Sequence, residues 1–243
     1  MQAYQVRPAG SFSVNNCTAG GNRSHIMKNS VLCSILALVT ALPAMARDDL
    51  NHWDFSDARK TADGKIIVQG SDGRNFSSSD PAITLVEDRK APGRKALAFS
   101  GEQVKPPSLG PVYERPGPVK VKFSVNPKPD TGEPEQTILV HPGVYELRYN
   151  RKRGDLTAYF PQKDPQKFVS VRAPLTAGQW SEVELSAKDG KVTLTVDGKS
   201  VRMTFPGGAS MQSTKAYARI GMMDYGRPFT GMLADLTIGD PAE

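Results

Sequence analysis

Short segments in which apolar and polar residues alternate recur along the chain after residue 51. Residues 119–125 (VKVKFSV) place every apolar side chain on one face and both lysines on the other, and residues 191–196 (KVTLTV) repeat the pattern. A period of two residues is typical of a β-strand with one buried face. After residue 51 no helix-length segment carries apolar residues at a period of 3.6, so the pattern predicts an all-β protein.

About fourteen segments are predicted to be strands, because they alternate or are rich in β-branched residues and are separated by turn signals. They are residues 52–55, 66–69, 82–87, 96–99, 119–125, 137–140, 144–150, 156–160, 167–171, 180–186, 191–196, 200–205, 217–222 and 232–238. A two-sheet antiparallel β-sandwich accommodates so many short strands more economically than a closed barrel. We expect one such domain over residues 47–243.

Turn residues divide these segments. Asp189-Gly190 and Asp197-Gly198 predict two tight hairpin turns, since both residue types tolerate positive φ. Residues 180–201 are therefore expected to form a three-stranded meander. The proline-rich segments 101–118 and 127–134 are expected to be loops or edges, because proline cannot donate to a strand ladder.

A secretory signal peptide is predicted over residues 27–46. Lys28 precedes a short apolar run, and Ala44-Met45-Ala46 supplies a cleavage site of small residues. The run is shorter than the ~20 residues that a membrane-spanning helix needs, so no integral membrane segment is expected after its removal. Residues 1–26 are interpreted as an upstream extension from a mis-assigned start. The mature protein is expected to be exported, and to be periplasmic or extracellular.

Removal of this leader changes the charge and the cysteine content. The formal net charge falls from +6 to +3 with the loss of Arg7, Arg23 and Lys28, and both cysteines, Cys17 and Cys33, leave with it. A cysteine-free mature chain excludes disulfides, a thiolate nucleophile and cysteine-ligated zinc. Its small net charge and its export argue against a nucleic-acid partner.

Two longer segments carry a family resemblance. Residues 175–201 (LTAGQWSEVELSAKDGKVTLTVDGKSV) and 218–239 (ARIGMMDYGRPFTGMLADLTIG) resemble the laminin-G-like branch of the concanavalin A-like lectin/glucanase superfamily. The characteristic positions are Trp180, the Val-Asp-Gly that ends at Gly198, Ile220-Gly221, and the Phe-Thr-Gly that ends at Gly231. The resemblance implies a concanavalin A-like jelly roll, a fold that hosts lectins, adhesion modules, glycosidases and lyases.

The resemblance favours a lectin-like, carbohydrate-binding or interaction module that recognises a glycan or cell-envelope polysaccharide, neutral or anionic. Hydrolases of the superfamily carry a Glu-x-Asp-x-(x)-Glu array on one strand, with acids spaced for retention. The nearest match here, Glu182-Val183-Glu184, has no third acid and is interpreted as a solvated strand face. A hydrolase is therefore disfavoured.

The hairpin over residues 144–160 is the candidate site. One face of its first strand carries Tyr145, Leu147 and Tyr149, and the other carries Glu146, Arg148 and Asn150. If the first face is core, the second lines the outer surface of the sheet. The candidate ligand-binding residues are Glu146, Arg148, Asn150, Arg151, Arg153 and Tyr159. Their arginine forks suit a carboxylate, sulfate or phosphate, whereas the plainer interpretation is a charged hairpin tip with a cross-strand Glu146–Arg148 pair.

Two rival functions stay open. The first is an enzyme acting on polysaccharide, a lyase rather than a hydrolase, in which His141, Arg148 and Tyr159 neutralise a uronate and move its α-proton. This alternative requires the three side chains to converge. The second rival is a structural envelope or adhesion module that binds a protein and no small ligand.

No cofactor is required by the sequence. The resemblance allows a structural Ca²⁺ held by oxygen ligands, with Asp54 or Asp235 as the candidate carboxylates. Each is also accounted for as an ordinary carboxylate at a strand end.

Overall fold

The computed structural model describes residues 51–71, 73, 75–87, 93–109, 119–162, 168–205, 217–223 and 226–239. The predicted signal peptide (residues 27–46) and the upstream segment (residues 1–26) lie outside these ranges. Residues 45–243 group into one compact unit. None of the helical segments in the described ranges has the length and apolar character of a membrane span.

Within the described ranges, strands account for nearly all the regular structure, as the alternation predicts, and the one helical element there is a single 3₁₀ turn, η1 (Phe55–Asp57). The strands are β1 (Asn51–Trp53), β2 (Arg59–Lys60), β3 (Ile66–Gln69), β4 (Asn75–Ser78), β5 (Ile83–Glu87), β6 (Lys95–Ser100), β7 (Val119–Pro127), β8 (Glu135–His141), β9 (Tyr145–Asn150), β10 (Asp155–Pro161), β11 (Phe168–Pro174), β12 (Ser181–Lys188), β13 (Lys191–Val196), β14 (Lys199–Thr204), β15 (Arg219–Ile220) and β16 (Thr230–Gly239).

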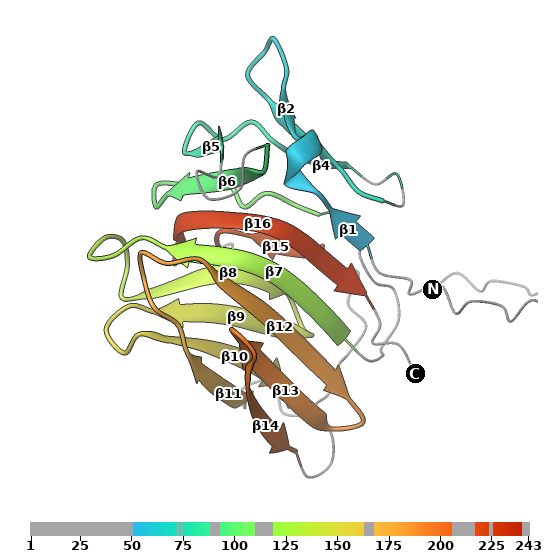
Figure 1. Ribbon diagram of the computed structural model, residues 1–243, viewed down its shortest axis with the longest axis vertical. Helices are drawn as coiled ribbons and strands as arrows, with labels where there is room; N and C mark the ends of the chain where they lie inside the picture. Colours follow the sequence, from blue (N-terminus) through green and yellow to red (C-terminus); the bar gives the residue numbers. More distant parts are fainter. Residues whose placement is uncertain are drawn as a thin grey trace, which may run out of the picture. The chain divides into compact units, whose positions relative to one another are not determined.

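Antiparallel pairing arranges these strands in two layers. One sheet has the order β14-β13-β12-β7-β16-β6-β5, with β1 also paired to β16, and Figure 1 shows its central strands side by side. The other layer contains the five-stranded sheet β11-β10-β9-β8-β15 and the three-stranded sheet β2-β3-β4. Ser108 connects these two parts, because it forms single bridges with Ser77 of β4 and with Arg219 of β15. The predicted two-sheet antiparallel sandwich is confirmed.

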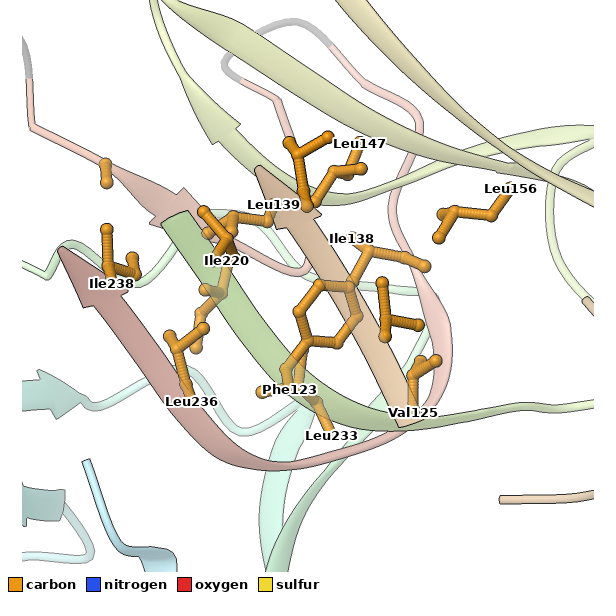
Figure 2. Close-up of a cluster of buried hydrophobic side chains, with 14 of the residues drawn as sticks. Phe123, Val125, Ile138, Leu139, Leu147, Leu156, Ile220, Leu233, Leu236 and Ile238 are labelled. Atoms are coloured by element: carbon orange, nitrogen blue, oxygen red, sulfur yellow. The ribbon is translucent and has the colours of Figure 1, made fainter. Parts of the chain in front are cut away.

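The core lies between the two layers. Figure 2 shows Phe123 of β7 and Leu233 of β16 close to Ile138 of β8 and Leu147 of β9, and all four are at most 1% exposed. The apolar face predicted for residues 119–125 is buried in full, as are the alternate apolar residues of β13. Burial of these side chains is the main force that holds a cysteine-free sandwich together.

Turn chemistry sets the meander β12-β13-β14. Asp189 and Gly190 have φ values of 50° and 72°, and Asp197 and Gly198 have 49° and 76°. Positive φ at both central residues matches the twist of a two-residue hairpin. Both turns therefore lie where the Asp-Gly pairs predict them.

Two glycines of the family motifs are required by packing. Gly221 has φ of 77°, and a Cβ there would overlap the ring of Phe99. The Phe99 ring in turn meets Phe229 edge-on, with centroids 5.7 Å apart. Gly231 has φ of 151°, and its Cβ would lie 2.5 Å from the carbonyl oxygen of Asn126. These positions explain Ile-Gly and Phe-x-Gly as steric requirements of the sandwich.

Candidate functional site

The outer face of the five-stranded sheet carries most of the candidate residues. Tyr145, Leu147 and Tyr149 of β9 are at most 2% exposed and belong to the core. Alternation therefore directs Glu146, Arg148 and Asn150 to the opposite face. We call the surface formed there by β8 to β11 and β15 the outer face.

Arg148 is the centre of a dense set of contacts on this face. Its guanidinium carbon lies 4.4 Å from the centroid of the Tyr159 ring on β10. The same guanidinium forms a short ion pair with Glu146 and lies 3.8 Å from Glu135 of β8. Burial lowers the pKa of Arg148, but the hydrogen bond and charge of Glu146 outweigh this effect and raise it, so the cation is retained.

Glu146 is held from three directions. Besides Arg148, it accepts a hydrogen bond of 2.8 Å from Thr137 Oγ1, and Arg227 Nη1 lies 3.8 Å away. Arg227 has a φ of 58°, which is uncommon for a residue with a side chain. The side chain of Glu146 is only 8% exposed. It therefore acts as a fixed anchor for the arginines around it.

The hairpin tip is also ordered by hydrogen bonds. The Asn150 side-chain oxygen accepts from the Arg153 backbone N–H at 2.9 Å, and Arg153 Nε donates to Asp155 at 2.7 Å. The Arg151 backbone N–H donates to the carbonyl oxygen of Pro134 at 2.9 Å. Arg153 is thus positioned at the end of the outer face, with its charge partly compensated by Asp155.

His141 does not join Arg148 and Tyr159. It pairs with Tyr145, lies on the core side of β8 and is 1% exposed. Its ring meets the Tyr145 ring edge-on, with centroids 6.0 Å apart. The three candidate catalytic side chains are therefore divided between two faces of the sheet, and only Arg148 and Tyr159 are together.

The structure adds residues that the sequence does not single out. Thr157 of β10 pairs with Arg148 on one side and with Arg172 of β11 on the other, so the two arginines lie on the same face. Arg172 is exposed, and it has no ion pair with another described residue. Glu135 and Thr137 were also not predicted, because they come from a segment without a distinctive motif. Arg227 was not predicted either, because the resemblance over residues 218–239 does not mark that position.

Two shallow pockets of about 430 and 450 Å³ lie away from the hairpin. Both are lined by Asp80, Pro81 and Val104. Asp80 accepts backbone hydrogen bonds from Val104 at 2.8 Å and Lys105 at 3.1 Å. Asp80 thereby ties the loop after β6 to the turn before β5. Serine and proline residues line the first pocket, and no sequence motif marks them.

The candidate calcium ligands have protein partners. The Asp54 side chain caps η1 by accepting from the Ser56 N–H at 2.8 Å, and Asp235 forms an ion pair of 2.5 Å with Arg94. Burial raises the pKa of Asp54, but the Ser56 hydrogen bonds and the nearby charges of His52 and Arg94 lower it overall. In the described ranges, no three histidine, cysteine or acidic side chains gather as they would around a metal ion.

The acids of β12 have partners on the neighbouring strand β7 of the same sheet. Glu184 lies 3.1 Å from Lys122, and Glu182 accepts a hydrogen bond of 2.7 Å from Ser124. Both acids thus lie among neighbouring lysine and serine side chains on a strand face. This environment is that of a solvated sheet surface.

Comparison with known proteins places this geometry in a family context. Residues 146–240 match the model of the Laminin G domain family. Over these residues the sequence is similar to a laminin G domain, and the described part of the chain has the antiparallel sandwich fold given above. The matched range includes the outer-face residues of β9, β10 and β11. No curated protein matches the chain in sequence.

Solved structures share the fold of this laminin G-like domain. Domain 4 of AbnA, an extracellular arabinanase from Geobacillus stearothermophilus, in complex with arabinotriose, superposes with a TM-score of 0.57 at 16% identity, over 79% of this chain and 92% of that one. The botulinum neurotoxin serotype D binding domain superposes with a TM-score of 0.56 at 12% identity, over 79% of this chain and 49% of that one. The binding domain of botulinum neurotoxin DC in complex with SialylT superposes with a TM-score of 0.50 at 12% identity, over 72% of this chain and 46% of that one. The chain thus spans about half the length of these neurotoxin domains.

Proposed function

We propose that the laminin G-like domain binds glycans on its outer face and prefers glycans that carry negative charge. The observation that carries this proposal is the partly exposed Tyr159 ring, with the Arg148 guanidinium 4.4 Å from its centroid. Glu146, which accepts a hydrogen bond from Thr137, holds that arginine in place, so the aromatic surface is positioned before a ligand arrives. A preformed aromatic surface loses little conformational entropy on binding.

The charge of the outer face supports an anionic ligand. Among the described residues it carries the arginines Arg148, Arg153, Arg172, Arg219 and Arg227 and the acids Glu135, Glu146 and Asp155. Cations are in excess, and exposed Arg172 lies one strand from Tyr159. Its planar fork matches a carboxylate or sulfate better than an ammonium group does.

Similar structures support the same ligand class. The AbnA domain is described in complex with arabinotriose, and a neurotoxin binding domain in complex with SialylT. We further propose that the protein is exported, on the strength of the leader pattern over residues 27–46. A periplasmic or extracellular domain meets polysaccharides of the cell envelope and its surroundings.

The test is a glycan array with neutral and anionic polysaccharides, followed by calorimetry on the best ligand. Tyr159→Ala is expected to weaken binding at least about tenfold, equivalent to about 1.4 kcal/mol, whereas Tyr159→Phe retains the ring and most of the affinity. Arg172→Ala is expected to weaken anionic ligands and to reduce the dependence on salt. Lys191→Ala, an exposed position on β13 of the other sheet, is the matched control. Unchanged affinity in Tyr159→Ala would overturn the proposal.

The same assay distinguishes the two rival functions. A lyase would convert the bound uronate to an unsaturated product with ultraviolet absorbance. The separation of His141 from Arg148 and Tyr159 removes the geometric support for that alternative. If the protein binds no glycan and no absorbance develops, the results would instead favour a protein-interaction module.

A further inference from the structure

The row of outer-face residues that contains Tyr159 continues beyond the five-stranded sheet. Tyr159 pairs with Glu146, Glu146 with Val140, and Val140 with Arg219. Ser108 then bridges Arg219 and Ser77 of β4. Directly paired residues of antiparallel strands share a face. Tyr159 and Ser77 therefore lie on the same face of the layer, although 82 positions separate them in the sequence. Between them, Glu146 and Val140 are only 7% and 2% exposed, so the longer side chains around them form the surface there.

A pocket lies at the far end of this row. Ser77 and Ser108 line the cavity of about 430 Å³, together with Ser78, Pro106 and Pro107. Hydroxyl groups beside apolar proline rings suit a sugar, which has polar edges and apolar faces. The volume is within the usual range for small-ligand pockets. The row thus has an aromatic ring at one end and a polar pocket at the other.

The distance between the two ends follows from the strand spacing. Five steps lead from β10 through β9, β8, β15 and the Ser108 segment to β4. At ~4.8 Å a step, the row measures about 24 Å. This is the length of several linked sugar rings and exceeds that of a disaccharide.

Cationic side chains occupy the space between the ends. Arg148 and Arg227 flank Glu146, which also accepts a hydrogen bond from Thr137, and Arg148 lies 3.8 Å from Glu135 as well. Arg219 follows one strand further along the row. A polymer with a negative charge on successive units would meet an arginine at several points.

We propose that this row is an extended site for a linear acidic oligosaccharide, which lies across the strands from Tyr159 to the pocket at Ser77 and Ser108. The inference rests on the proposed function and adds the length and direction of the ligand. The domain would then bind internal segments of a polysaccharide, whereas a site for a single sugar would bind the end of a chain.

The test measures the affinity of the full chain for oligogalacturonates, as dimer, tetramer and hexamer. The hexamer is expected to bind at least about tenfold more tightly than the dimer, because it reaches the pocket. Ser79→Trp fills the pocket from an exposed position and is expected to remove that gain while leaving dimer affinity unchanged. Glu102→Trp places the same bulk in the neighbouring pocket, off the row, and is the control.

A second variant guards against misfolding of the first. Lys105→Glu reverses an exposed charge that lines the pocket and is expected to weaken the hexamer selectively. Two results would overturn the extended site alone, provided that Tyr159→Ala still weakens binding of the dimer. One is an affinity that does not depend on the length of the oligogalacturonate. The other is an equal loss of affinity for all three lengths in Ser79→Trp. Absence of binding to every glycan on the array overturns the proposed function as well.

Discussion

Arg148 and Tyr159 lie on adjacent strands with the guanidinium carbon 4.4 Å from the ring centroid. The pairing of β9 with β10 brings them together, and the ion pair with Glu146 fixes the rotamer of the arginine. A cation held over an aromatic ring contributes about 0.5–2 kcal/mol, depending on its exposure. The pair thus connects the stability of the outer face with the glycan binding proposed for it.

Loss of Arg148 is expected to destabilise the fold. Arg148→Ala leaves the buried Glu146 carboxylate with Thr137 and a more distant Arg227, so the free energy of unfolding should fall by about 1–3 kcal/mol. Urea denaturation measures this change. Arg172→Ala on the same face, which has no ion pair with a described residue, should stay within about 0.5 kcal/mol of the wild type. Equal effects from the two variants would contradict the assigned role of Glu146.

The steric origin of the Ile-Gly motif can be isolated with two glycines of the same conformation. Gly221 and Gly198 have φ of 77° and 76°, but only Gly221 has an atom in the way of a Cβ. Gly198→Ala should cost about 1 kcal/mol for backbone strain. Gly221→Ala should lower the free energy of unfolding by about 1–3 kcal/mol more than Gly198→Ala does, because it displaces the Phe99 ring. Thermal and urea unfolding of the two variants give the difference, and similar losses would disprove the steric explanation.

Asp80 makes stability depend on pH. Burial raises its pKa, but the backbone N–H groups of Lys105, Ala82 and Val104 lower it overall, below the model-peptide value near 3.9. A depressed folded pKa contributes stability above the unfolded pKa, and that contribution is lost as the pH falls through the folded pKa. Asp80→Asn should therefore destabilise the protein by about 1 kcal/mol at neutral pH and by less near pH 3. A difference that is constant between these pH values would contradict this role.

Calcium is expected to leave thermal stability unchanged. Asp235 is paired with Arg94, and Asp54 caps η1 near the same arginine. A second cation would have to displace these partners. The melting temperature of protein treated with chelator and then returned to excess Ca²⁺ should change by less than about 1 °C. A rise of several degrees, abolished by Asp235→Asn, would instead establish Asp235 as a ligand.

The alternating segments predicted the sandwich because each has one clear apolar face. The strand β4 was not predicted, since its sequence NFSS has a single apolar residue and serines are typical of turns. Its place in the sheet is set by Phe76, which is fully buried. The two-residue β2, Arg59–Lys60, has no apolar residue at all. Such strands form through tertiary contacts that no local pattern records.

Local sequence patterns also predicted only part of the candidate site. The faces of residues 145–150 follow from alternation, so Glu146, Arg148 and Asn150 could be grouped. β8 contains a register shift between Thr137 and Leu139, and this irregularity turns His141 toward the core. The sequence ILV at 138–140 is apolar throughout and gives no sign of the shift. Without it, His141 would share the face of Thr137 and Glu146.

The single-residue connection at Ser108 has a consequence for motion. Among the described residues of the layer that contains both sheets, the bridges of Ser108 to Ser77 of β4 and to Arg219 of β15 supply the backbone pairing between them. The β2-β3-β4 segment is therefore a candidate for opening as a unit, with backbone amide exchange faster than in β8, β9 and β10. An extended ligand that contacts both sheets would stabilise the connection between them. Its binding would slow backbone amide exchange on both sides of Ser108.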